Sequence, residues 1–448
     1  MKVVHQGFAM VVGVALLLAA GWALWPTSSV LTRVHDEVGV RSAAPTDAPN
    51  VVLVMLCTFR MDRTSLRDPA LNTTPWLESA ARRGVWFDST IASAPWTRPA
   101  AISLLAGRHA ISLGMVEPGP SRNKRALPTD VPTLAQSFRA AGWHTIGASA
   151  NPNLASHYGM TTGFDAYFEP SLRWHEGGPK VLGDTVVDHV LAELDRTPRD
   201  GPLFVQVMLI DAHSPRQARW WDVSHPGPPA VRDYDAALTQ QDRVLARMAD
   251  LLAERGLTEQ NTVFVLVSDH GEGLNFPDTL GAGHGRQLRP AVLDALWVMY
   301  GAGVGQDVQV SGLTSQVDVA PTVLALAGLA PFSGPGLDLS EVSAGGGHTR
   351  RAQAFSDTWF LNENRAAVFT DSMGCERTYG VPGTSVQCFD RRTPGGAAEP
   401  IQPGLVRALD QWRTRQIAEG VGAPGVEIVT EEPELERHLE ALGYVEGD

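Results

Sequence analysis

Positive charge is scarce in this sequence, which sets 36 Lys and Arg residues against 49 Asp and Glu residues and has a formal net charge of −13. No basic run is longer than the short segment Arg122-Asn123-Lys124-Arg125. This charge balance disfavours non-specific binding to nucleic acid or to anionic lipid. A small anionic substrate would need a local positive centre, and a metal ion is the simplest way to supply one.

The sequence also lacks tandem repeats, and its composition excludes a disordered chain. Of its 448 residues, 44% are hydrophobic and 19% are charged, which is typical of a globular protein. This length is enough for two or three domains, or for one large α/β domain with an appendage.

The N-terminus contains an apolar run without a single charged residue, from Gly7 to Trp25, that ends at Pro26. The run is about as long as a bilayer-spanning helix. It is either a cleaved secretory signal or an uncleaved signal anchor; its length and the poor cleavage site at Gly21-Trp22-Ala23 favour the anchor. We therefore expect residues 1–26 to be this membrane segment, 27–49 to be a polar linker, and the body of the protein to be extracytoplasmic.

Cysteine is rare, with three in the whole chain. A turn-rich stretch separates Cys375 from Cys388, so in an exported protein these two residues are expected to form a disulfide. Cys57 is then left without a disulfide partner. It follows an aliphatic run and precedes polar residues, so it is a nucleophile, a metal ligand or a small buried side chain.

Strand-like and helix-like segments alternate along the chain. The aliphatic runs predict buried strands at 50–56, 143–148, 203–210, 262–267 and 295–300. Proline near the start, glycine just past the end and apolar periodicity predict helices at 74–84, 132–142 and 233–255. This alternation predicts an α/β fold with a doubly wound, mostly parallel sheet over 50–342. Residues 343–448 are expected to form a small C-terminal subdomain with an antiparallel sheet, a helix near 405–417 and a terminal helix at 434–442.

Three of the predicted strands run directly into polar residues, at the sheet edge where open α/β folds bind their ligands. The residues that follow them are Cys57, the segment Asp211-Ala212-His213, and the segment Ser268-Asp269-His270-Gly271-Glu272. Asp269 and His270 together would supply two metal ligands at one strand end. The alternative is a helix N-cap followed by a hydrogen-bonded loop histidine.

Thr97 stands where a helix is expected to begin, with Pro99 in its first turn. It is either an ordinary N-cap or a hydroxyl nucleophile, placed where a helix N-terminus stabilises an anionic centre and a metal lowers the hydroxyl pKa. His284 lies between Gly283 and Gly285, which let backbone and ligand approach closely, although such a histidine on its own is compatible with a plain loop residue.

Taken together, these motifs resemble the sulfatase family of the alkaline-phosphatase superfamily over nearly the whole chain after the linker. The resemblance implies an alkaline-phosphatase-like fold and a metal-dependent hydrolase or transferase acting on a small anionic sulfate or phosphate ester. In that picture Asp269 and His270 bind the metal and Thr97 is the nucleophile. His213 and His284 contact the transferred or leaving group, or help to hold a second metal near Asp211. The motifs are Cys57-Thr58-Phe59-Arg60-Met61-Asp62, Thr97-Arg98-Pro99-Ala100, Ser103-Leu104-Leu105-Ala106-Gly107-Arg108, Asp211-Ala212-His213, Ser268-Asp269-His270-Gly271-Glu272, Gly283-His284-Gly285, 317–324 and Leu442-Gly443-Tyr444-Val445.

The sequence departs from the family at the nucleophile. Sulfatases carry Cys or Ser in Cys/Ser-x-Pro-x-Arg and convert it to formylglycine, whereas this chain has Thr97 there and Ala101 in place of the Arg. Threonine lacks the primary carbon that formylglycine requires. The family's Lys-x-His is replaced by Ser149-Ala150-Asn151-Pro152-Asn153. A threonine nucleophile resembles the phosphodiesterase and phosphoethanolamine-transferase branches, which pass through a phospho-threonine.

A second departure is Cys57, which stands where the family has its first metal-binding Asp. A thiolate suits Zn²⁺ and suits Ca²⁺ or Mg²⁺ poorly. We therefore predict one divalent metal, with Zn²⁺ favoured, held by Cys57, Thr97, Asp269 and His270. The competing interpretations are a sulfatase-type hydrolase with unusual threonine chemistry and an anchored, catalytically impaired binding module.

Overall fold

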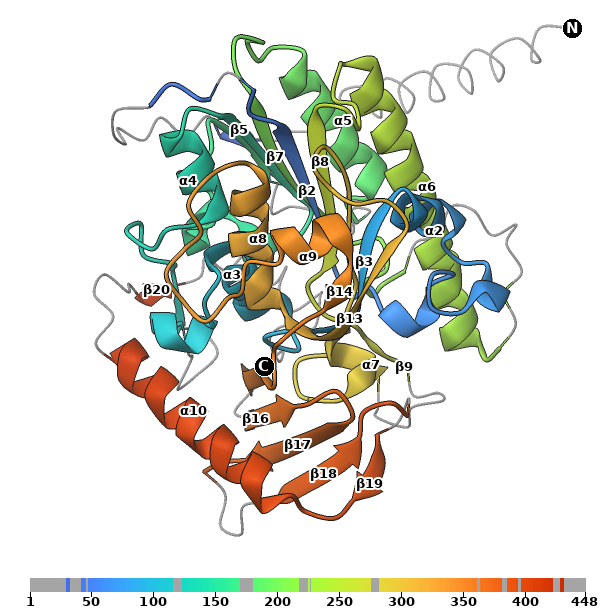
Figure 1. Ribbon diagram of the computed structural model, residues 1–448, viewed down its shortest axis with the longest axis vertical. Helices are drawn as coiled ribbons and strands as arrows, with labels where there is room; N and C mark the ends of the chain where they lie inside the picture. Colours follow the sequence, from blue (N-terminus) through green and yellow to red (C-terminus); the bar gives the residue numbers. More distant parts are fainter. Residues whose placement is uncertain are drawn as a thin grey trace, which may run out of the picture.

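The structure, a computed structural model, describes residues 30–32, 42–45, 47–115, 123–169, 180–216, 225, 227–274, 282–360, 363–380, 385–393, 396–421 and 428–430 (Figure 1). The predicted membrane segment at 1–26, the terminal helix at 434–442 and the Leu442–Val445 motif lie outside these ranges. Within them, no helix has both the length and the apolar character needed to cross a membrane.

A large sheet forms the centre of the molecule, with strand order β1-β6-β5-β7-β2-β8-β12-β3-β13-β14 and with β11 paired to β3. Its interior strands pair in parallel, apart from β12, which is antiparallel to both β8 and β3. The strands are β1 (Val30–Thr32), β2 (Asn50–Leu56), β3 (Gly84–Ile91), β5 (His144–Ser149), β6 (Ala166–Glu169), β7 (Leu203–Leu209), β8 (Thr262–Ser268), β11 (Asp294–Ala295), β12 (Trp297–Gly301), β13 (Val308–Ser315) and β14 (Gly347–His348).

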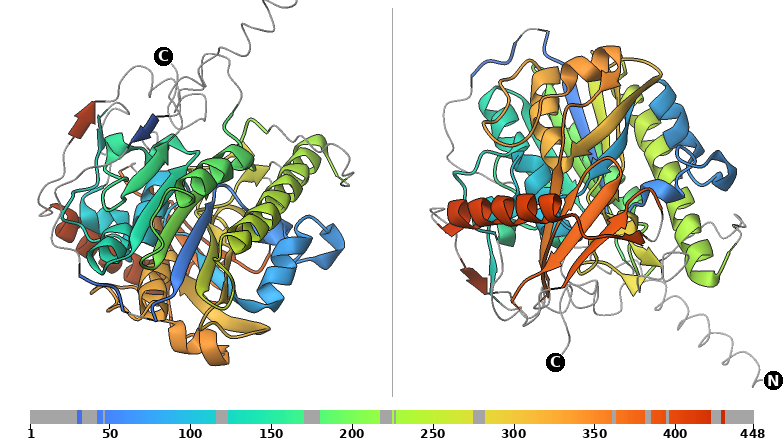
Figure 2. Two further views of the ribbon diagram at one scale, coloured as in Figure 1. Left: turned by 90° about the horizontal axis from the view of Figure 1, so that it is seen from above. Right: turned by 60° about the horizontal axis from the view of Figure 1, so that its bottom comes forward.

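Helices cover both faces of this sheet, so the predicted doubly wound, mostly parallel α/β fold is confirmed (Figures 1 and 2). Helices α2, α5 and α6 pack together on one face, and α3, α4, α8 and α9 lie on the other. The bounds are α2 (Pro75–Arg82), α3 (Thr97–Ala106), α4 (Leu134–Ala140), α5 (Gly183–Leu194), α6 (Pro229–Glu254), α7 (Pro290–Leu293), α8 (Val319–Leu326) and α9 (Ser340–Gly345). Short 3₁₀ helices are η1 (Met61–Arg63), η2 (Pro69–Leu71), η3 (Ala110–Leu113), η4 (Pro152–Leu154), η5 (Ser156–Tyr158) and η7 (Gln316–Asp318).

The central strands are buried because helices cover them on both sides. Every residue of β7 and β8 is buried, as is every residue of β2 after Asn50. Their unbroken runs of aliphatic residues are what a strand with two covered faces requires. The polar residues at the ends of these strands are therefore held by a rigid, well-packed part of the molecule.

The C-terminal region forms a second, antiparallel sheet with strand order β15-β16-β17-β18-β19, and α10 lies across it (Figure 2). Cys375 on β17 is directly opposite Cys388 on β18, and the two form the predicted disulfide. The elements are β15 (Ala354–Phe360), β16 (Glu363–Phe369), β17 (Met373–Thr378), β18 (Val386–Asp390), β19 (Ala397–Glu399) and α10 (Pro403–Val421). Two small sheets pair β9 (Gly273–Leu274) with β10 (Ala282–Gly283) and β4 (Asn123–Arg125) with β20 (Ile428–Thr430).

Two details differ from the sequence-based expectations. Part of the segment interpreted as a tether joins the large sheet, because β1 pairs with β6. The strand expected at 295–300 runs antiparallel, which its aliphatic composition could not indicate. The proposed boundary at residue 343 stays a prediction; β14, which follows it, still pairs with β13 in the large sheet.

Candidate active site

The carboxyl ends of β7, β2 and β8 lie side by side in the middle of the large sheet. The parallel register sets Leu56 beside Leu209 on one strand and beside Ser268 on the other. The residues that follow each strand therefore leave the sheet at the same edge, as expected for ligand-binding residues of an open α/β sheet. This brings Cys57, Asp269 and His270 together, as the sequence predicted.

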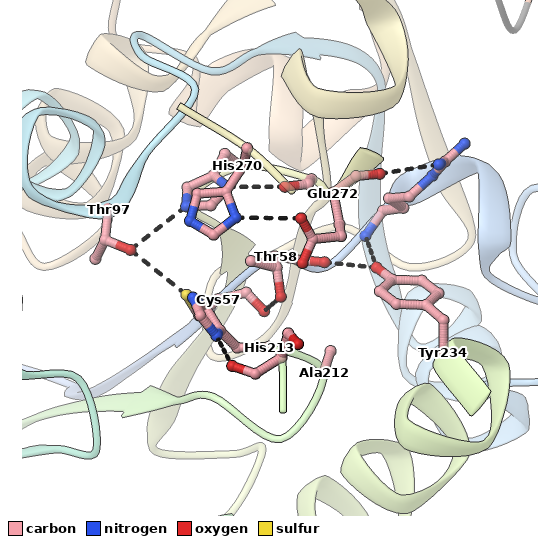
Figure 3. A network of polar contacts seen from close by, with 12 residues as sticks. Cys57, Thr58, Thr97, Ala212, His213, Tyr234, His270 and Glu272 are labelled. Carbon is pink, nitrogen blue, oxygen red and sulfur yellow. Dashed lines mark hydrogen bonds and ion pairs between the residues drawn. The ribbon is translucent and has the colours of Figure 1, made fainter. Parts of the chain in front are cut away.

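Thr97 is the first residue of α3, and the N-cap position belongs to Trp96, whose backbone is extended. The interpretation of Thr97 as an ordinary N-cap is therefore wrong. Its side chain is fully buried and its hydroxyl lies 3.5 Å from the sulfur of Cys57 and 3.4 Å from Nε2 of His270 (Figure 3). The hydroxyl is thus at the helix N-terminus but faces the strand ends.

The two carboxylate oxygens of Asp269 have different surroundings in the described part of the chain. Its Oδ1 accepts hydrogen bonds from the backbone N–H groups of Thr58, at 3.2 Å, and His270, at 2.7 Å. Its Oδ2 is buried and has no hydrogen-bond partner among the residues that the structure describes. Residues 270–272 after Asp269 are irregular and lead into β9 (Gly273–Leu274), so Asp269 is not a helix N-cap either. An unsatisfied buried carboxylate oxygen is costly unless a cation or a donor binds it.

His270 is oriented so that one ring nitrogen can bind a metal. Its Nδ1 lies 2.8 Å from the carbonyl oxygen of Gly271, which accepts the Nδ1–H hydrogen bond and leaves the lone pair of Nε2 directed toward Thr97. Burial, the largest cause, lowers the pKa of His270 and so favours the neutral ring that metals bind. Its Nε2 is 3.4 Å from Oδ2 of Asp269.

These residues fit a divalent metal ion. Ligand atoms of Cys57, Asp269 and His270 all lie within 4.8 Å of one another, and all three residues are buried. A tetrahedral zinc with bonds of ~2.0 Å to N and O and ~2.3 Å to S sets its ligand atoms roughly 3.3–3.5 Å apart. The separations of 3.4 Å and 3.5 Å among Thr97, His270, Asp269 and Cys57 are in this range.

His284 and His213 form a second side of the site. The rings of His284 and His270 have centroids 4.6 Å apart, and those of His284 and His213 are 5.0 Å apart. Nδ1 of His284 lies 3.2 Å from Oε1 of the buried Glu272, which Arg216 also contacts. Burial opposes ionisation of Glu272, but the charges of His284 and Arg216 outweigh it and lower the pKa of this carboxyl. Burial and the neighbouring His284 hold the pKa of His213 well below its usual range.

Asp211 follows β7, as the sequence predicted, and its carboxylate contacts helices α5 and α6. Its carboxylate accepts hydrogen bonds from the backbone N–H of Gly183, at the start of α5, and from the side chain of Gln240 on α6. This carboxylate therefore binds the helix layer, and the second metal expected near Asp211 and His284 stays a prediction. No group of three or more potential ligands in the described ranges includes Asp211.

Known proteins resemble this chain in sequence and in fold. The family model of the sulfatases matches residues 49–329. The chain belongs to the sulfatase family. Among curated relatives, the low-salt glycan biosynthesis sulfotransferase Agl7 of Haloferax volcanii is 27% identical over 270 residues, 56% of this chain and 57% of the relative. An ulvan-active sulfatase of Formosa agariphila is 22% identical over 351 residues, 66% of this chain and 65% of the relative. The matches thus cover less than two thirds of either relative's length.

Solved structures of other proteins share the fold. One, in complex with its substrate D-glucosamine-2-N,6-O-disulfate, superimposes with a TM-score of 0.68 at 14% identity, covering 84% of this chain and 99% of that one. The phosphonate monoester hydrolase of Silicibacter pomeroyi gives a TM-score of 0.63 at 16% identity, covering 86% and 100%. The sulfatase-family fold is therefore common to proteins acting on sulfate and on phosphonate esters.

Two residues of this sulfatase-family site were missed in the sequence. Asn151, where the family's Lys-x-His is absent, directs Nδ2 to the hydroxyl of Thr97 at 3.2 Å and to the sulfur of Cys57 at 3.5 Å. Lys180 is buried and donates to the backbone carbonyls of Asp211 and His213, and burial lowers its pKa to about 8. The position of Asn151 just after β5 could have indicated that it lies at the ligand-binding edge of the sheet. Nothing in the sequence around Lys180 indicated that this residue lies near the site.

Proposed function

We propose that the protein is a metal-dependent phosphodiesterase or phosphotransferase that uses Thr97 as its nucleophile. The observation that carries this proposal is the buried Thr97 hydroxyl, 3.5 Å from the sulfur of Cys57 and 3.4 Å from Nε2 of His270, beside the unsatisfied Oδ2 of Asp269. A hydroxyl among three metal ligands is the arrangement that activates a weak nucleophile.

The metal would be held by Cys57, Asp269 and His270, with Thr97 as the fourth ligand. Bound Zn²⁺ would lower the pKa of the Thr97 hydroxyl and offset the negative charge of the transferred group. A thiolate ligand favours Zn²⁺ over Mg²⁺ or Ca²⁺. Zinc is therefore the metal that this ligand set selects.

The other groups of the site would have separate roles in the transfer reaction. Thr97, after losing its proton to solvent, forms a bond from Oγ1 to phosphorus, and the bond from phosphorus to the leaving oxygen breaks. Asn151 donates through Nδ2 toward the reacting hydroxyl and is placed to donate to a non-bridging oxygen of the transferred group. The N-terminus of α3 favours the same negative charge.

His284 is the proposed acid for the leaving oxygen. Its contact with the buried carboxylate of Glu272 orients the ring, in the way that a carboxylate orients a catalytic imidazole. His213, held by its contact from Nδ1 to the carbonyl of Ser214, would contact the transferred group as a neutral ring. Water or an acceptor hydroxyl then takes the phosphoryl group from Thr97 and restores the hydroxyl.

The relatives support a second candidate, transfer or hydrolysis of a sulfate ester through the same residues. A sulfotransferase and a sulfatase are the two curated relatives described above. Threonine cannot form formylglycine, so such a reaction would require direct attack by the Thr97 hydroxyl. This difference makes phosphate esters our first choice.

Turnover of bis-p-nitrophenyl phosphate and of p-nitrophenyl sulfate by the zinc-loaded protein tests the proposal. We expect greater turnover of the phosphodiester, its loss in Thr97→Ala, and its partial retention in Thr97→Ser, which keeps the hydroxyl. Higher turnover of the sulfate ester would select the second candidate. No turnover of any ester, with zinc bound, would favour a binding module that keeps the fold without the chemistry.

A further inference from the structure

The turn that follows β2 has an unusual backbone. Thr58 adopts a φ of 55°, in the left-handed region that β-branched residues avoid. Such strained positions persist only where the surroundings hold them, and they gather at functional sites. Here the strained residue directly follows Cys57.

This conformation of Thr58 serves the candidate metal ligands. It directs the Thr58 N–H to Oδ1 of Asp269 at 3.2 Å, which turns Oδ2 toward Nε2 of His270. The Thr58 hydroxyl donates to the carbonyl oxygen of Cys57 at 2.7 Å and so stiffens the same turn. Two of the three proposed metal ligands, Cys57 and Asp269, thus depend on the backbone of Thr58.

The hydroxyl of Tyr234 holds the turn after β2 through two hydrogen bonds. Its hydroxyl donates to the carbonyl oxygen of Thr58 at 2.5 Å and accepts from the backbone N–H of Arg60 at 2.9 Å (Figure 3). One side chain therefore bridges both ends of the strained segment. Tyr234 is fully buried on α6, a helix of 26 residues, and the guanidinium of Arg216 lies 5.0 Å from its ring centroid.

We propose that Tyr234 is a positioning residue for the candidate metal centre: its hydroxyl holds Thr58 in the left-handed conformation and thereby orients Asp269 and Cys57 for the metal. This inference rests on the proposed metal site. Because Tyr234 comes from α6 while the ligands follow β2 and β8, the helix layer contributes directly to metal affinity. A merely structural hydroxyl would affect folding stability and leave the affinity for metal unchanged.

The test measures Zn²⁺ affinity of the full chain by competition with a chelator, together with the thermal midpoint of the metal-free protein. We expect Tyr234→Phe to bind Zn²⁺ about 10- to 100-fold more weakly, as is typical when a residue that supports a metal ligand is lost. Tyr379→Phe is the matched control, because it loses a hydroxyl contact to Asp410 in the C-terminal region, away from the site. It should bind Zn²⁺ like the wild type.

The same Tyr234→Phe substitution in a Thr58→Gly protein tests whether the effect on Zn²⁺ binding acts through the backbone of Thr58. Thr58→Gly removes the β-branched side chain that makes a φ of 55° unfavourable, and with it the hydrogen bond from the Thr58 hydroxyl to Cys57, so Tyr234→Phe in this background is compared with Thr58→Gly alone. In this background Tyr234→Phe should weaken Zn²⁺ binding much less than in the wild type. Equal effects in both backgrounds, or a Tyr234→Phe protein that loses thermal stability but binds Zn²⁺ like the wild type, would overturn the inference. A wild-type protein that binds no Zn²⁺ would instead overturn the proposed metal site.

Discussion

The hydroxyl oxygen of Thr97 lies 3.5 Å from the sulfur of Cys57, although the two residues come from different elements 40 positions apart. Two of the positions where the sequence analysis finds a departure from the family pattern are thus in contact. The proposed nucleophile, which cannot become formylglycine, lies beside the proposed ligand, a thiol that would favour zinc. The two substitutions are consistent with one change of chemistry, from an oxidised sulfatase nucleophile to a zinc-activated threonine.

Replacing Cys57 with Asp should change the metal that supports turnover. A carboxylate prefers hard cations, so Cys57→Asp is expected to gain Mg²⁺- or Mn²⁺-dependent turnover that the wild type lacks. Cys57→Ala is the control, since it offers no ligand and should lose activity with every metal. The measurement is initial rate against a series of divalent metals. An unchanged metal preference in Cys57→Asp would argue against Cys57 as a ligand.

Removing the amide of Asn151 should slow the chemical step. Asn151→Ala deletes the Nδ2 donor that lies 3.2 Å from the Thr97 hydroxyl. Loss of one donor of this kind typically lowers kcat by about 10²- to 10³-fold. Steady-state kinetics should therefore show the loss in kcat, with Zn²⁺ content unchanged. A rise in KM alone would show that Asn151 only binds the ground state.

The effect of replacing His284 should depend on the leaving group. If His284 protonates the leaving oxygen, His284→Gln should lower turnover of a phenyl ester by about 10²-fold or more. Turnover of a p-nitrophenyl ester should fall much less, because p-nitrophenolate needs no proton to leave. His109→Gln changes another buried histidine, whose ring packs against Trp412, and serves as the control. Equal losses for both esters would contradict the acid role.

The free energy of unfolding should depend on pH through the titration of Asp242. This carboxylate accepts the backbone N–H groups of Trp76 and Leu77 at the start of α2, each at 2.9 Å. Burial raises its pKa from 3.8 to about 6, although those two hydrogen bonds oppose the rise. Between these values the folded state binds more protons than the unfolded state, so the free energy of unfolding falls as the pH rises.

The contribution of Asp242 is therefore fully present below about pH 4 and lost as the pH rises through about 6, a change of up to about 3 kcal/mol. The measurement is the difference in Tm between the wild type and Asp242→Asn, both metal-free, from pH 4 to pH 7. It should decline across this range. A difference that stays constant would show that Asp242 does not titrate there.

The sequence predicted the middle of the sheet well. Strands β2, β7 and β8 were placed to within one or two residues, because strands covered on both faces need unbroken aliphatic runs. Strands β3 and β13 were missed. Each has several partly exposed residues, and β13 also changes register between Val310 and Leu313. The antiparallel direction of β12 could not be predicted, because the amino-acid composition of a buried strand does not indicate its direction.

The candidate site was predicted where its residues follow strands or begin a helix, as Cys57, Thr97, Asp269 and His270 do. Lys180 and Tyr234 were not predicted to lie near the site, because Lys180 comes from an irregular segment and Tyr234 from the second turn of the long helix α6. The direction of the Asp211 side chain could not be predicted for a related reason. Its position after β7 is as expected, but the direction of its side chain is set by Gly183 and Gln240, which are distant in sequence.

The central claim is that Cys57, Asp269 and His270 hold a zinc ion beside the Thr97 hydroxyl. Elemental analysis of the purified, dialysed protein tests it most directly, with His270→Ala and Asp269→Ala beside the wild type. The account predicts about one zinc per wild-type chain and almost none in either variant, since loss of one ligand of a buried tetrahedral site greatly weakens binding. A wild-type protein without bound metal, or variants that retain it in full, would contradict the account.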